Sequence, residues 1–535
     1  MALMSLLIAA QAHAAYRTSG RAERKAERAL ARAQALFDPA SRGKAPPADA
    51  TSVLQDLSLR SDELTGRERE RANALQARPT DGAADQFGDG YRLGKAGVRH
   101  TCFRLKARAR RSRRICVHWA KRTRDAPPKT DANGNGRRDQ VDHTIATLKA
   151  VWKREVAQLG YRAPRRDRGP RGGEGPNDGI DVYLADVGFD GLYGYCATDP
   201  RTAKQRRQRT AHAYCVLDDD FSEQQFPSPG VNGSKALHVT AAHEFFHAVQ
   251  FAYDYSRRDQ WLREGTAVWM EDEVYDGINA GYDFLDESPL SQPDVPLDEF
   301  GAPDTGERPE YGAWIFWRFL SEYFRSPGVI RKVWGQVANG RRALDATSAV
   351  VEGRRPSYCL IRCGAVTIAD VLAEFHAWNL LTSQPAYWDY WFGPTQWRTL
   401  FAPTYEEEAG YADAIGPVPS DAEFFLDGQH PTTGRRALSV DHLSERMVAI
   451  VLPEASRVRI DLDLPPKDRG SAASVVWVDG NGVNGQPISL DSTGSGSIDL
   501  PESTTPSPEF IVLLLHNTSA SHDGEPYAYT ARIVP

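Results

Sequence analysis

The 535-residue sequence lacks several features that would assign a protein to a class at once. Beyond its first residues, no run approaches 18 consecutive apolar residues, so no membrane-spanning helix is predicted. The net charge is only −6, which points to no particular kind of partner. No internal repeat is evident, so a solenoid or a propeller is not expected. The six cysteines include no C-x-x-C pair, which excludes the usual structural zinc arrays.

What the chain does have is enough length and apolar content for more than one hydrophobic core. A chain of this size is expected to form two or three domains. Hydrophobic residues make up 41% of it and the mean hydropathy is −0.51, which is typical of globular domains with sizeable cores.

The N-terminal region reads as a targeting segment followed by helices. Met1–Ala14 combines an apolar run with an Ala-x-Ala pattern that suits signal-peptidase cleavage. We interpret it as a candidate signal peptide; the alternative is a short helix packed on the body of the protein. Residues 15–96 are rich in Arg and Ala and have helical periodicity. They are either a pro-region or helices that cover the next domain, and we expect a secreted or periplasmic protein.

The six cysteines fall into three pairs that are close in sequence. Export would place them in an oxidising compartment, where we expect each pair to form a disulfide on grounds of proximity. The alternative is six buried free thiols in a cytosolic protein. The predicted pairs are Cys102–Cys116, Cys196–Cys215 and Cys359–Cys363.

A basic segment, Thr101–Asp125, holds ten basic side chains against one acidic side chain. Two strand-like runs flank its centre, which predicts a β-hairpin with a basic tip. Such a tip can contact nucleic acid or an anionic membrane surface, but a solvated hairpin is the interpretation we favour. No nucleic-acid partner is therefore expected.

The strongest chemical signal lies in Val239–Asp276. His243, Glu244 and His247 form an H-E-x-x-H pattern. On a helix predicted from about residue 234 to residue 255, the two histidines lie one turn apart on the same face, where both imidazoles can reach one Zn²⁺. Glu244 lies beside them and can take a proton from a metal-bound water. The alternative is a core helix whose histidines make ordinary hydrogen bonds.

A second helix, predicted from Gln260 to Tyr275, supplies two acidic candidates. Glu264 follows His247 by 17 positions and provides the third protein ligand that a catalytic zinc site needs. Glu271 lies two turns further along the same helix face, where its carboxylate can hold the second nitrogen of a ligating histidine.

These residues resemble the gluzincin metallopeptidases, the group that includes thermolysin-like and aminopeptidase-N-like enzymes. The resemblance is carried by HEFFH and by WLREGTAVWME, in which Arg263 stands in place of the family's Asn. The order of these motifs with DANGNGRRDQVD, IDVYLAD and YGAW is similar to that in a group of secreted bacterial metalloproteases, over residues 97–383. The resemblance implies a zincin-like catalytic domain, which we place at residues 97–430.

The resemblance also implies roles for single residues. Its implied zinc ligands are His243, His247 and Glu264, with Glu244 as the general base. Tyr311, in PEYGAW, corresponds to the tyrosine that steadies the tetrahedral oxyanion. The aminopeptidase signature G-x-M-E-N is missing, which favours an endopeptidase. The expected activity is hydrolysis of protein or peptide substrates by a zinc-activated water.

A second metal signal lies at residues 131–142, which read D-x-N-x-N-G-x-x-D-x-x-D. Alternating oxygen-bearing side chains with a glycine at the sixth position resemble the Ca²⁺ loops of EF-hand and dockerin-type repeats. The alternative is an Asn/Gly turn that ends in an acidic helix cap. The candidate calcium ligands are Asp131, Asn133, Asn135, Arg137 (through its carbonyl oxygen), Asp139 and Asp142.

Residues 431–535 consist of short β-like runs separated by Gly, Pro, Asp and Ser, which is typical of a β-sandwich. The predicted fold is therefore α+β: a zincin-like catalytic domain followed by a C-terminal β-sandwich. The sandwich has no catalytic constellation, and carbohydrate or surface contact is a candidate role for it. A competing hypothesis is a non-catalytic, metal-stabilised adhesin or carbohydrate-binding protein. The Trp-rich stretch 385–397 is interpreted as core.

Overall fold

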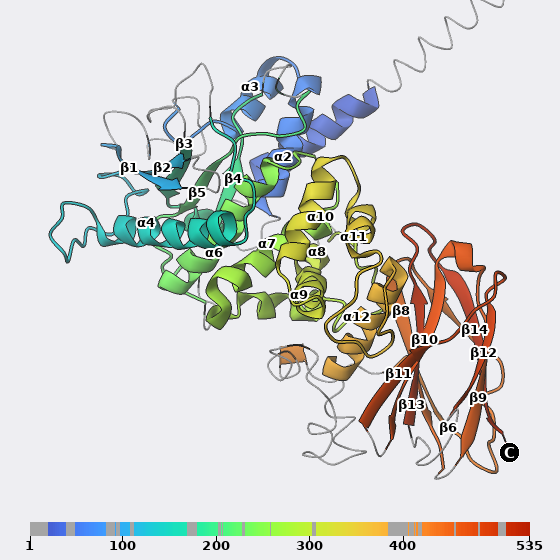
Figure 1. Cartoon of the computed structure of the whole chain (residues 1–535). Helices are drawn as coiled ribbons and strands as arrows, with labels where there is room; N and C mark the ends of the chain where they lie inside the picture. The colour runs from blue at the N-terminus through green and yellow to red at the C-terminus, as the bar shows by residue number, and fades with distance from the viewer. Residues whose placement is uncertain are drawn as a thin grey trace, which may run out of the picture. The chain divides into compact units, whose positions relative to one another are not determined.

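The computed structural model, shown in Figure 1, divides the described part of the chain into two compact units. The described residues are 20–38, 49–81, 91, 97–106, 112–167, 179–201, 205, 207–226, 231–256, 258–301, 307–383, 405, 411, 414–415, 420–453, 456–479, 482–500 and 510–534. The predicted signal peptide and the Trp-rich stretch lie outside these residues. The first unit comprises Met1–Arg258, Met270–Ala280 and Ala302–Gly306, and the second comprises Asp259–Trp269, Gly281–Gly301 and Glu307–Pro535.

A five-stranded sheet with the order β1-β2-β3-β5-β4 forms the centre of the first unit. Its strands are β1 (Arg99–Lys106), β2 (Ser112–Trp119), β3 (Gly179–Ala185), β4 (Gly194–Ala197) and β5 (Tyr214–Asp218). β2, β3 and β5 are parallel, whereas β1 and β4 run antiparallel at the two edges. The carboxyl ends of three neighbouring strands therefore meet at one edge of the sheet.

The two faces of this sheet are covered by different helices, as the alternation of side chains along a strand requires. Tyr195 and Val216 belong to a core cluster with Leu54 of helix α2 (Ala50–Arg60). Their sequence neighbours Cys196 and Cys215 face the other way, into a cluster formed with helix α6 (Gly233–Phe251). α6 packs against β4, β5 and helix α4 (Asp139–Trp152).

The N-terminal region is built into the core of the first unit. Ala26, Leu30 and Leu57 are buried in the same cluster as residues of the sheet. Arg78 extends this attachment, because its guanidinium pairs with Asp181 of β3 and, at 2.7 Å, with Asp199. In the sequence, helix α3 (Gly66–Leu75) lies between these two attachments.

The helices that carry the chemical signal form close to where they are predicted. α6 begins at Gly233 and ends at Phe251, a turn before the predicted end. Helix α7 spans Gln260–Tyr275, as predicted, and the boundary between the two units passes through it. The helix that follows the calcium-like loop is α4, which continues as the π-helix Lys153–Gln158.

The second unit combines helices with a β-sandwich. Its main helices are α8 (Pro309–Gly312), α9 (Trp314–Tyr323), α10 (Gly328–Ala338), α11 (Ala343–Val351) and α12 (Ile368–Ser383). One sheet of the sandwich has the order β11-β10-β13-β8-β6 and the other has the order β12-β9-β14-β7. Apolar side chains from both sheets form the core between them. α12 packs Ala377, Leu380 and Leu381 on the outer side of the first sheet.

Strand β9 alternates buried with more exposed residues, whereas β8 and β13 are buried almost throughout because α12 covers the outer face of their sheet. The strands are β6 (Ala422–Phe425), β7 (Arg436–Val440), β8 (Ser444–Val451), β9 (Arg457–Asp463), β10 (Ser471–Asp479), β11 (Gly482–Pro487), β12 (Ser495–Leu500), β13 (Phe510–Asn517) and β14 (Glu525–Val534). The first of them begins before residue 431. The α+β fold with a strand-rich C-terminal region is confirmed.

All three cysteine pairs form disulfides with the predicted pairing. Two of them join directly opposed residues of antiparallel strands: Cys102 with Cys116 across β1 and β2, and Cys196 with Cys215 across β4 and β5. Cys359–Cys363 closes a short loop in the second unit. Among the described residues, no helix has both the length and the apolar character needed to cross a bilayer.

Candidate metal centre

Helix α6 holds the H-E-x-x-H residues inside the protein. Every side chain from Val239 to Phe251 is buried. Apolar residues occur on all faces of this segment, which is the pattern of a helix enclosed by other elements. The polar side chains of His243, Glu244 and His247 are therefore held away from bulk water, in surroundings that favour a few fixed partners.

Two histidines and one glutamate come together as predicted. Each of His243, His247 and Glu264 offers one ligand atom, and the three atoms lie within 4.8 Å of one another. The residues are 7%, 1% and 1% exposed. Two imidazole nitrogens and one carboxylate oxygen are a ligand set that zinc takes in catalytic sites.

The second nitrogen of each imidazole is held by an acceptor. Nδ1 of His243 lies 2.7 Å from Oε1 of Glu271, and Nδ1 of His247 lies 2.9 Å from Oε1 of Gln250. Because both partner atoms are acceptors, the proton of each neutral ring belongs on Nδ1, which leaves the lone pair on Nε2. This tautomer is the one that a histidine uses to bind a metal through Nε2, so the residues fit a zinc ion.

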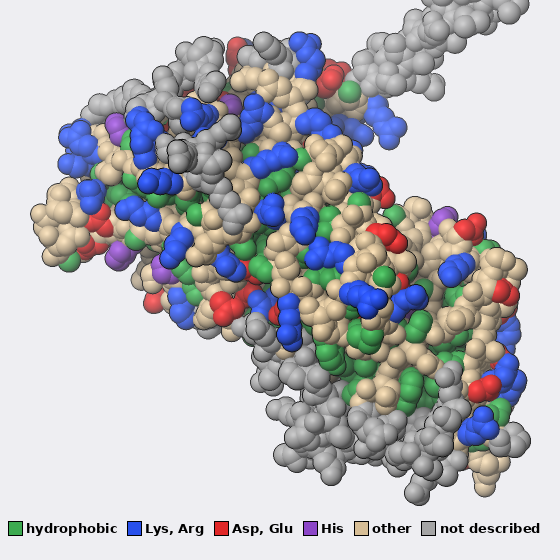
Figure 2. All heavy atoms as spheres, in the orientation of Figure 1, with side chains coloured by type: hydrophobic (Ala, Val, Ile, Leu, Met, Phe, Trp, Pro, Cys, Tyr) green, Lys and Arg blue, Asp and Glu red, His purple; other side chains and the backbone are tan. Residues whose placement is uncertain are grey.

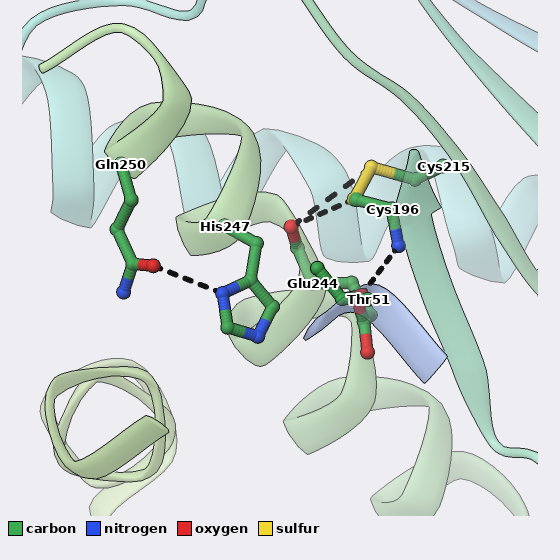
Figure 3. The surroundings of a disulfide bond; sticks show 6 residues. All are labelled: Thr51, Cys196, Cys215, Glu244, His247 and Gln250. Carbon is green, nitrogen blue, oxygen red and sulfur yellow. Dashed lines mark hydrogen bonds between the residues drawn. A yellow bond between two sulfur atoms is a disulfide. The ribbon is translucent and has the colours of Figure 1, made fainter. Parts of the chain in front are cut away.

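Glu244 is fixed by a residue from the N-terminal region (Figure 3). Thr51, the second residue of α2, donates a 2.9 Å hydrogen bond from Oγ1 to Oε2 of Glu244. The same Oγ1 accepts a 2.8 Å hydrogen bond from the backbone N–H of Cys196. Thr51 thus connects strand β4 to the carboxylate of the predicted base.

The Cys196–Cys215 disulfide lies next to the backbone carbonyl of Glu244 (Figure 3). The sulfur atoms of Cys196 and Cys215 are 2.9 and 3.9 Å from the carbonyl oxygen of Glu244. The disulfide therefore packs between the sheet and the turn of α6 that carries the base.

Tyr311, Arg263 and His238 are not among the three candidate ligands, and each packs against an aromatic ring. Tyr311, on α8, is 9% exposed and packs against the ring of Phe284 at 5.0 Å, and its role stays a prediction. Arg263, which replaces the family's Asn, lies over the ring of Trp334 at 5.7 Å. His238, on the same helix as the ligands, stacks on Tyr275 instead of joining the group.

The calcium-like loop is a compact exposed turn. Asp131 accepts hydrogen bonds from the backbone N–H groups of Asn135 and Gly136, at 3.0 and 2.9 Å. Asp139 accepts one from Ala132. Asp142, in the first turn of α4, accepts hydrogen bonds from the side-chain amides of Asn133 and Asn135 and from the guanidinium of Arg137. Calcium binding by this loop stays a prediction.

A further buried group lies in the second unit, where sequence spacing gives no signal. Glu445 of β8 lies between His376 of α12 and His516 of β13, with N···O distances of 3.5 and 3.3 Å. Burial lowers the pKa of His516 to about 3 and raises the pKa of Glu445. His376 thus belongs to a buried polar cluster at the junction of α12 and the sandwich.

The basic residues do not form one patch on the face shown in Figure 2. Lys and Arg side chains occur there singly or in small groups, separated by uncharged atoms. The predicted basic hairpin forms as β1 and β2, and its tip, residues 107–111, lies outside the described residues.

Sequence reasoning missed two partners of the site, Thr51 and Gln250. Helix geometry could have predicted the contact with Gln250, because Gln250 lies three positions after His247 on the same face. Thr51 carried no signal, since 193 positions separate it from Glu244.

No protein-family model matches the chain, and no curated protein sequence matches it. Among solved structures, an aminopeptidase A from Legionella pneumophila in complex with aspartic acid shares 10% sequence identity over 77% of this chain and 37% of that chain, with a TM-score of 0.30. A pre-peptidase C-terminal domain of a collagenase from Bacillus anthracis shares 11% identity over 22% of this chain and 97% of that domain, with a TM-score of 0.16. At these TM-scores neither likeness supports a functional assignment, which therefore rests on the residues of the site.

Proposed function

We propose that this protein is an exported zinc metallopeptidase of gluzincin type that hydrolyses peptide bonds in protein substrates. The observation that carries the proposal is the group formed by His243, His247 and Glu264, with Glu244 on the same buried helix. Glu244 distinguishes this group from a purely structural zinc site, because a structural site needs no adjacent base.

In this proposal, the residues around the metal have two different roles. His243, His247 and Glu264 hold the metal, while Glu271 and Gln250 fix the orientation and the tautomer of the two imidazoles. When bound, zinc supplies a Lewis acid that lowers the pKa of water and polarises a carbonyl.

Glu244 moves the protons. Thr51 occupies Oε2 of Glu244, so the other oxygen, Oε1, is the one that accepts a proton from the attacking water. As the water oxygen bonds to the carbonyl carbon and the C–N bond breaks, Glu244 passes that proton to the leaving amine. Its burial at 5% exposure keeps bulk water from competing for the same proton.

Substrate class and location follow from weaker features. The sequence has no G-x-M-E-N motif to hold a substrate N-terminus, which favours internal cleavage over removal of terminal residues. Three disulfides suit an oxidising compartment outside the cytoplasm. The C-terminal sandwich is proposed to contact substrate or a surface.

The experiment compares the wild type with Glu244→Gln, using metal content and cleavage of fluorescently labelled casein. Glu244→Gln keeps the three ligands and removes the base, so it should retain zinc and lose cleavage by at least ~10²-fold. Glu68→Gln, an exposed carboxylate on α3, serves as the matched control and should retain both. Zinc binding without cleavage by the wild type would favour the non-catalytic, metal-stabilised alternative, and full activity of Glu244→Gln would refute the proposed base.

A further inference from the structure

A second group of carboxylates lies where three parallel strands of the first unit end. Asp125 follows β2, Asp186 follows β3 directly, and Asp218 is the last residue of β5, with Asp219 next to it. β2, β3 and β5 are neighbours in the sheet, and Ala185 pairs with Asp218 in the register. The sheet therefore brings to one edge aspartates that lie far apart in the sequence.

These side chains converge closely. Asp186, Asp218 and Asp219 each offer a carboxylate oxygen, and the three oxygens lie within 4.8 Å of one another. Asp218 is fully buried, Asp219 is 5% exposed and Asp125 is 1% exposed. Asp125 joins the group through Asp186, whose backbone N–H donates to its Oδ1 at 3.2 Å.

Two of the carboxylates are held rigidly by the surrounding chain. Asp218 accepts hydrogen bonds from the backbone N–H groups of Gly188 and Phe221, both at 2.6 Å. Asp186 accepts a 2.6 Å hydrogen bond from Nε2 of Gln225. A Cβ on Gly188 would come within 2.7 Å of Oδ1 of Asp218, so the backbone approaches this carboxylate as closely as only glycine allows.

The other two carboxylates have fewer partners. Oδ1 of Asp125 has the N–H of Asp186 and, at 3.9 Å, Nε of Arg124. Asp219 makes no hydrogen bond and no ion pair with any described residue, although its carboxylate points into the group. Oδ2 of Asp125 is buried and has no hydrogen-bond partner among the described residues. Arg138 interacts electrostatically with Asp219, but its guanidinium donates to the backbone carbonyls of Pro127 and Lys121.

This arrangement is costly for a protein that binds nothing there. A buried carboxylate without hydrogen bonds loses hydration that nothing in the fold replaces, and neighbouring carboxylates repel it. In keeping with this, burial and then the neighbouring Asp218 raise the pKa of Asp219 to about 9. A cation between the carboxylates removes both costs at once.

We propose that Asp186, Asp218 and Asp219, assisted by Asp125, bind a Ca²⁺ ion at the carboxyl ends of β2, β3 and β5. The donors are all oxygens, which suits a hard cation and not zinc. Several carboxylates in one group favour Ca²⁺ over Mg²⁺, which keeps most of its own water. The proposal does not depend on peptidase activity, and its residues are separate from the calcium-like loop at 131–142.

The test uses the full chain, stripped with a chelator and titrated with Ca²⁺ alone by calorimetry, with the melting temperature followed in parallel. Asp219→Asn is the informative variant, because Asp219 has no hydrogen bond to lose and the substitution removes one ligand charge. We expect the affinity of one class of Ca²⁺ sites to drop by at least ~10-fold. We also expect most of the Ca²⁺-dependent rise in melting temperature to be lost. Without Ca²⁺, Asp219→Asn should be at least as stable as the wild type, since it relieves repulsion.

Two controls separate this site from other sources of binding. Asp131→Asn alters the calcium-like loop and should leave this class of sites unchanged. Terbium luminescence of the wild type, excited through tyrosine, gives a second readout because Tyr91 lies near Asp125 and Asp219. Equal Ca²⁺ affinity and equal Ca²⁺-dependent stabilisation in Asp219→Asn and the wild type would overturn the proposal. Loss of all Ca²⁺ binding in Asp131→Asn would also overturn it.

Discussion

The hydroxyl of Thr51 donates a 2.9 Å hydrogen bond to Oε2 of Glu244, although 193 positions separate the two residues. The same hydroxyl accepts from the N–H of Cys196, so its proton has one direction in which to point. Thr51 is therefore a positioning residue: it holds one oxygen of the proposed base and leaves the other to face the reacting water. The N-terminal helix α2 contributes directly to the site through this contact.

Replacement of Thr51 by Val tests this role. Val preserves the shape but removes the hydroxyl, so the carboxylate of Glu244 loses its orienting bond and the N–H of Cys196 loses its acceptor. We expect kcat to fall by about 10-fold with little change in KM, because the lost bond acts on the base and not on substrate binding. Steady-state kinetics on a labelled peptide gives the split.

Thr51→Ser is the matched control, since it retains the hydroxyl and should retain most of the activity. A rise in kcat for Thr51→Val would show that Thr51 restrains the base, which contradicts the positioning role. Unchanged kcat in both variants would mean that the contact has no part in turnover.

Glu271 should tune zinc affinity without binding the metal itself. Its carboxylate holds Nδ1 of His243 at 2.7 Å, and Glu271→Gln keeps an acceptor there but removes the charge. We expect zinc affinity to fall by roughly 10–100-fold, the usual cost of losing such an outer partner. Competition with a chromogenic chelator measures it.

Glu273→Gln provides the comparison for Glu271→Gln. Glu273 lies on the same helix, but its carboxylate pairs with Arg154. Zinc affinity in this variant should match that of the wild type. An equal loss of affinity in both variants would point to a general disturbance of α7 and would remove the specific role of Glu271.

Loss of the Cys196–Cys215 disulfide should reduce activity more than loss of the Cys359–Cys363 disulfide. Its loop spans 19 positions and its sulfurs lie against the carbonyl of Glu244, whereas Cys359–Cys363 spans only 4. Replacing both cysteines by Ser should cost roughly 3 kcal/mol for the first pair and roughly 2 kcal/mol for the second. Activity should fall only for the first pair. Equal loss of activity in the two double variants, at a temperature where both are folded, would contradict the link to Glu244.

The stability of the second unit should depend on pH through His442. Nε2 of His442 lies 2.7 Å from Asp298 and its Nδ1 contacts Asp523; the first of these hydrogen bonds is the larger cause that raises the pKa of His442 to about 9. A raised pKa means that the stabilisation is complete below about pH 6.5 and is lost as the pH rises through about 9.

Urea unfolding between pH 6 and pH 10 checks this prediction. Because Asp523 is largely exposed, we expect a loss on the order of 1–2 kcal/mol in the wild type and a flatter profile in His442→Gln. A wild-type profile that matches that of His442→Gln would show that the protonated imidazole contributes nothing.

The parts of the site that the sequence predicts are those set by local geometry. His243 and His247 share a helix face because four residues make about one turn, and Glu264 lies about one turn into the next predicted helix. Cysteine pairs close in sequence become opposed residues of neighbouring strands. For the two histidines and for these cysteines, the spacing along the chain largely determines the distance in space.

The parts that the sequence does not reveal depend on strand order and on contacts between distant segments. Asp125, Asp186 and Asp219 meet only because β2, β3 and β5 are neighbours in a parallel sheet, and no spacing rule connects them. Likewise, Thr51 reaches Glu244 only because α2 packs beside β4. Such groups become visible once the topology is known.

The central claim is that His243, His247 and Glu264 hold one zinc ion for hydrolysis. Its most direct test is the zinc content of the purified full chain, measured beside casein cleavage for the wild type, His247→Ala and His238→Ala. His238 lies on the same helix but stacks on Tyr275, so its variant controls for disturbance of α6. The account predicts one zinc per chain with activity in the wild type and in His238→Ala, and loss of both in His247→Ala. Unchanged zinc content in His247→Ala would contradict it.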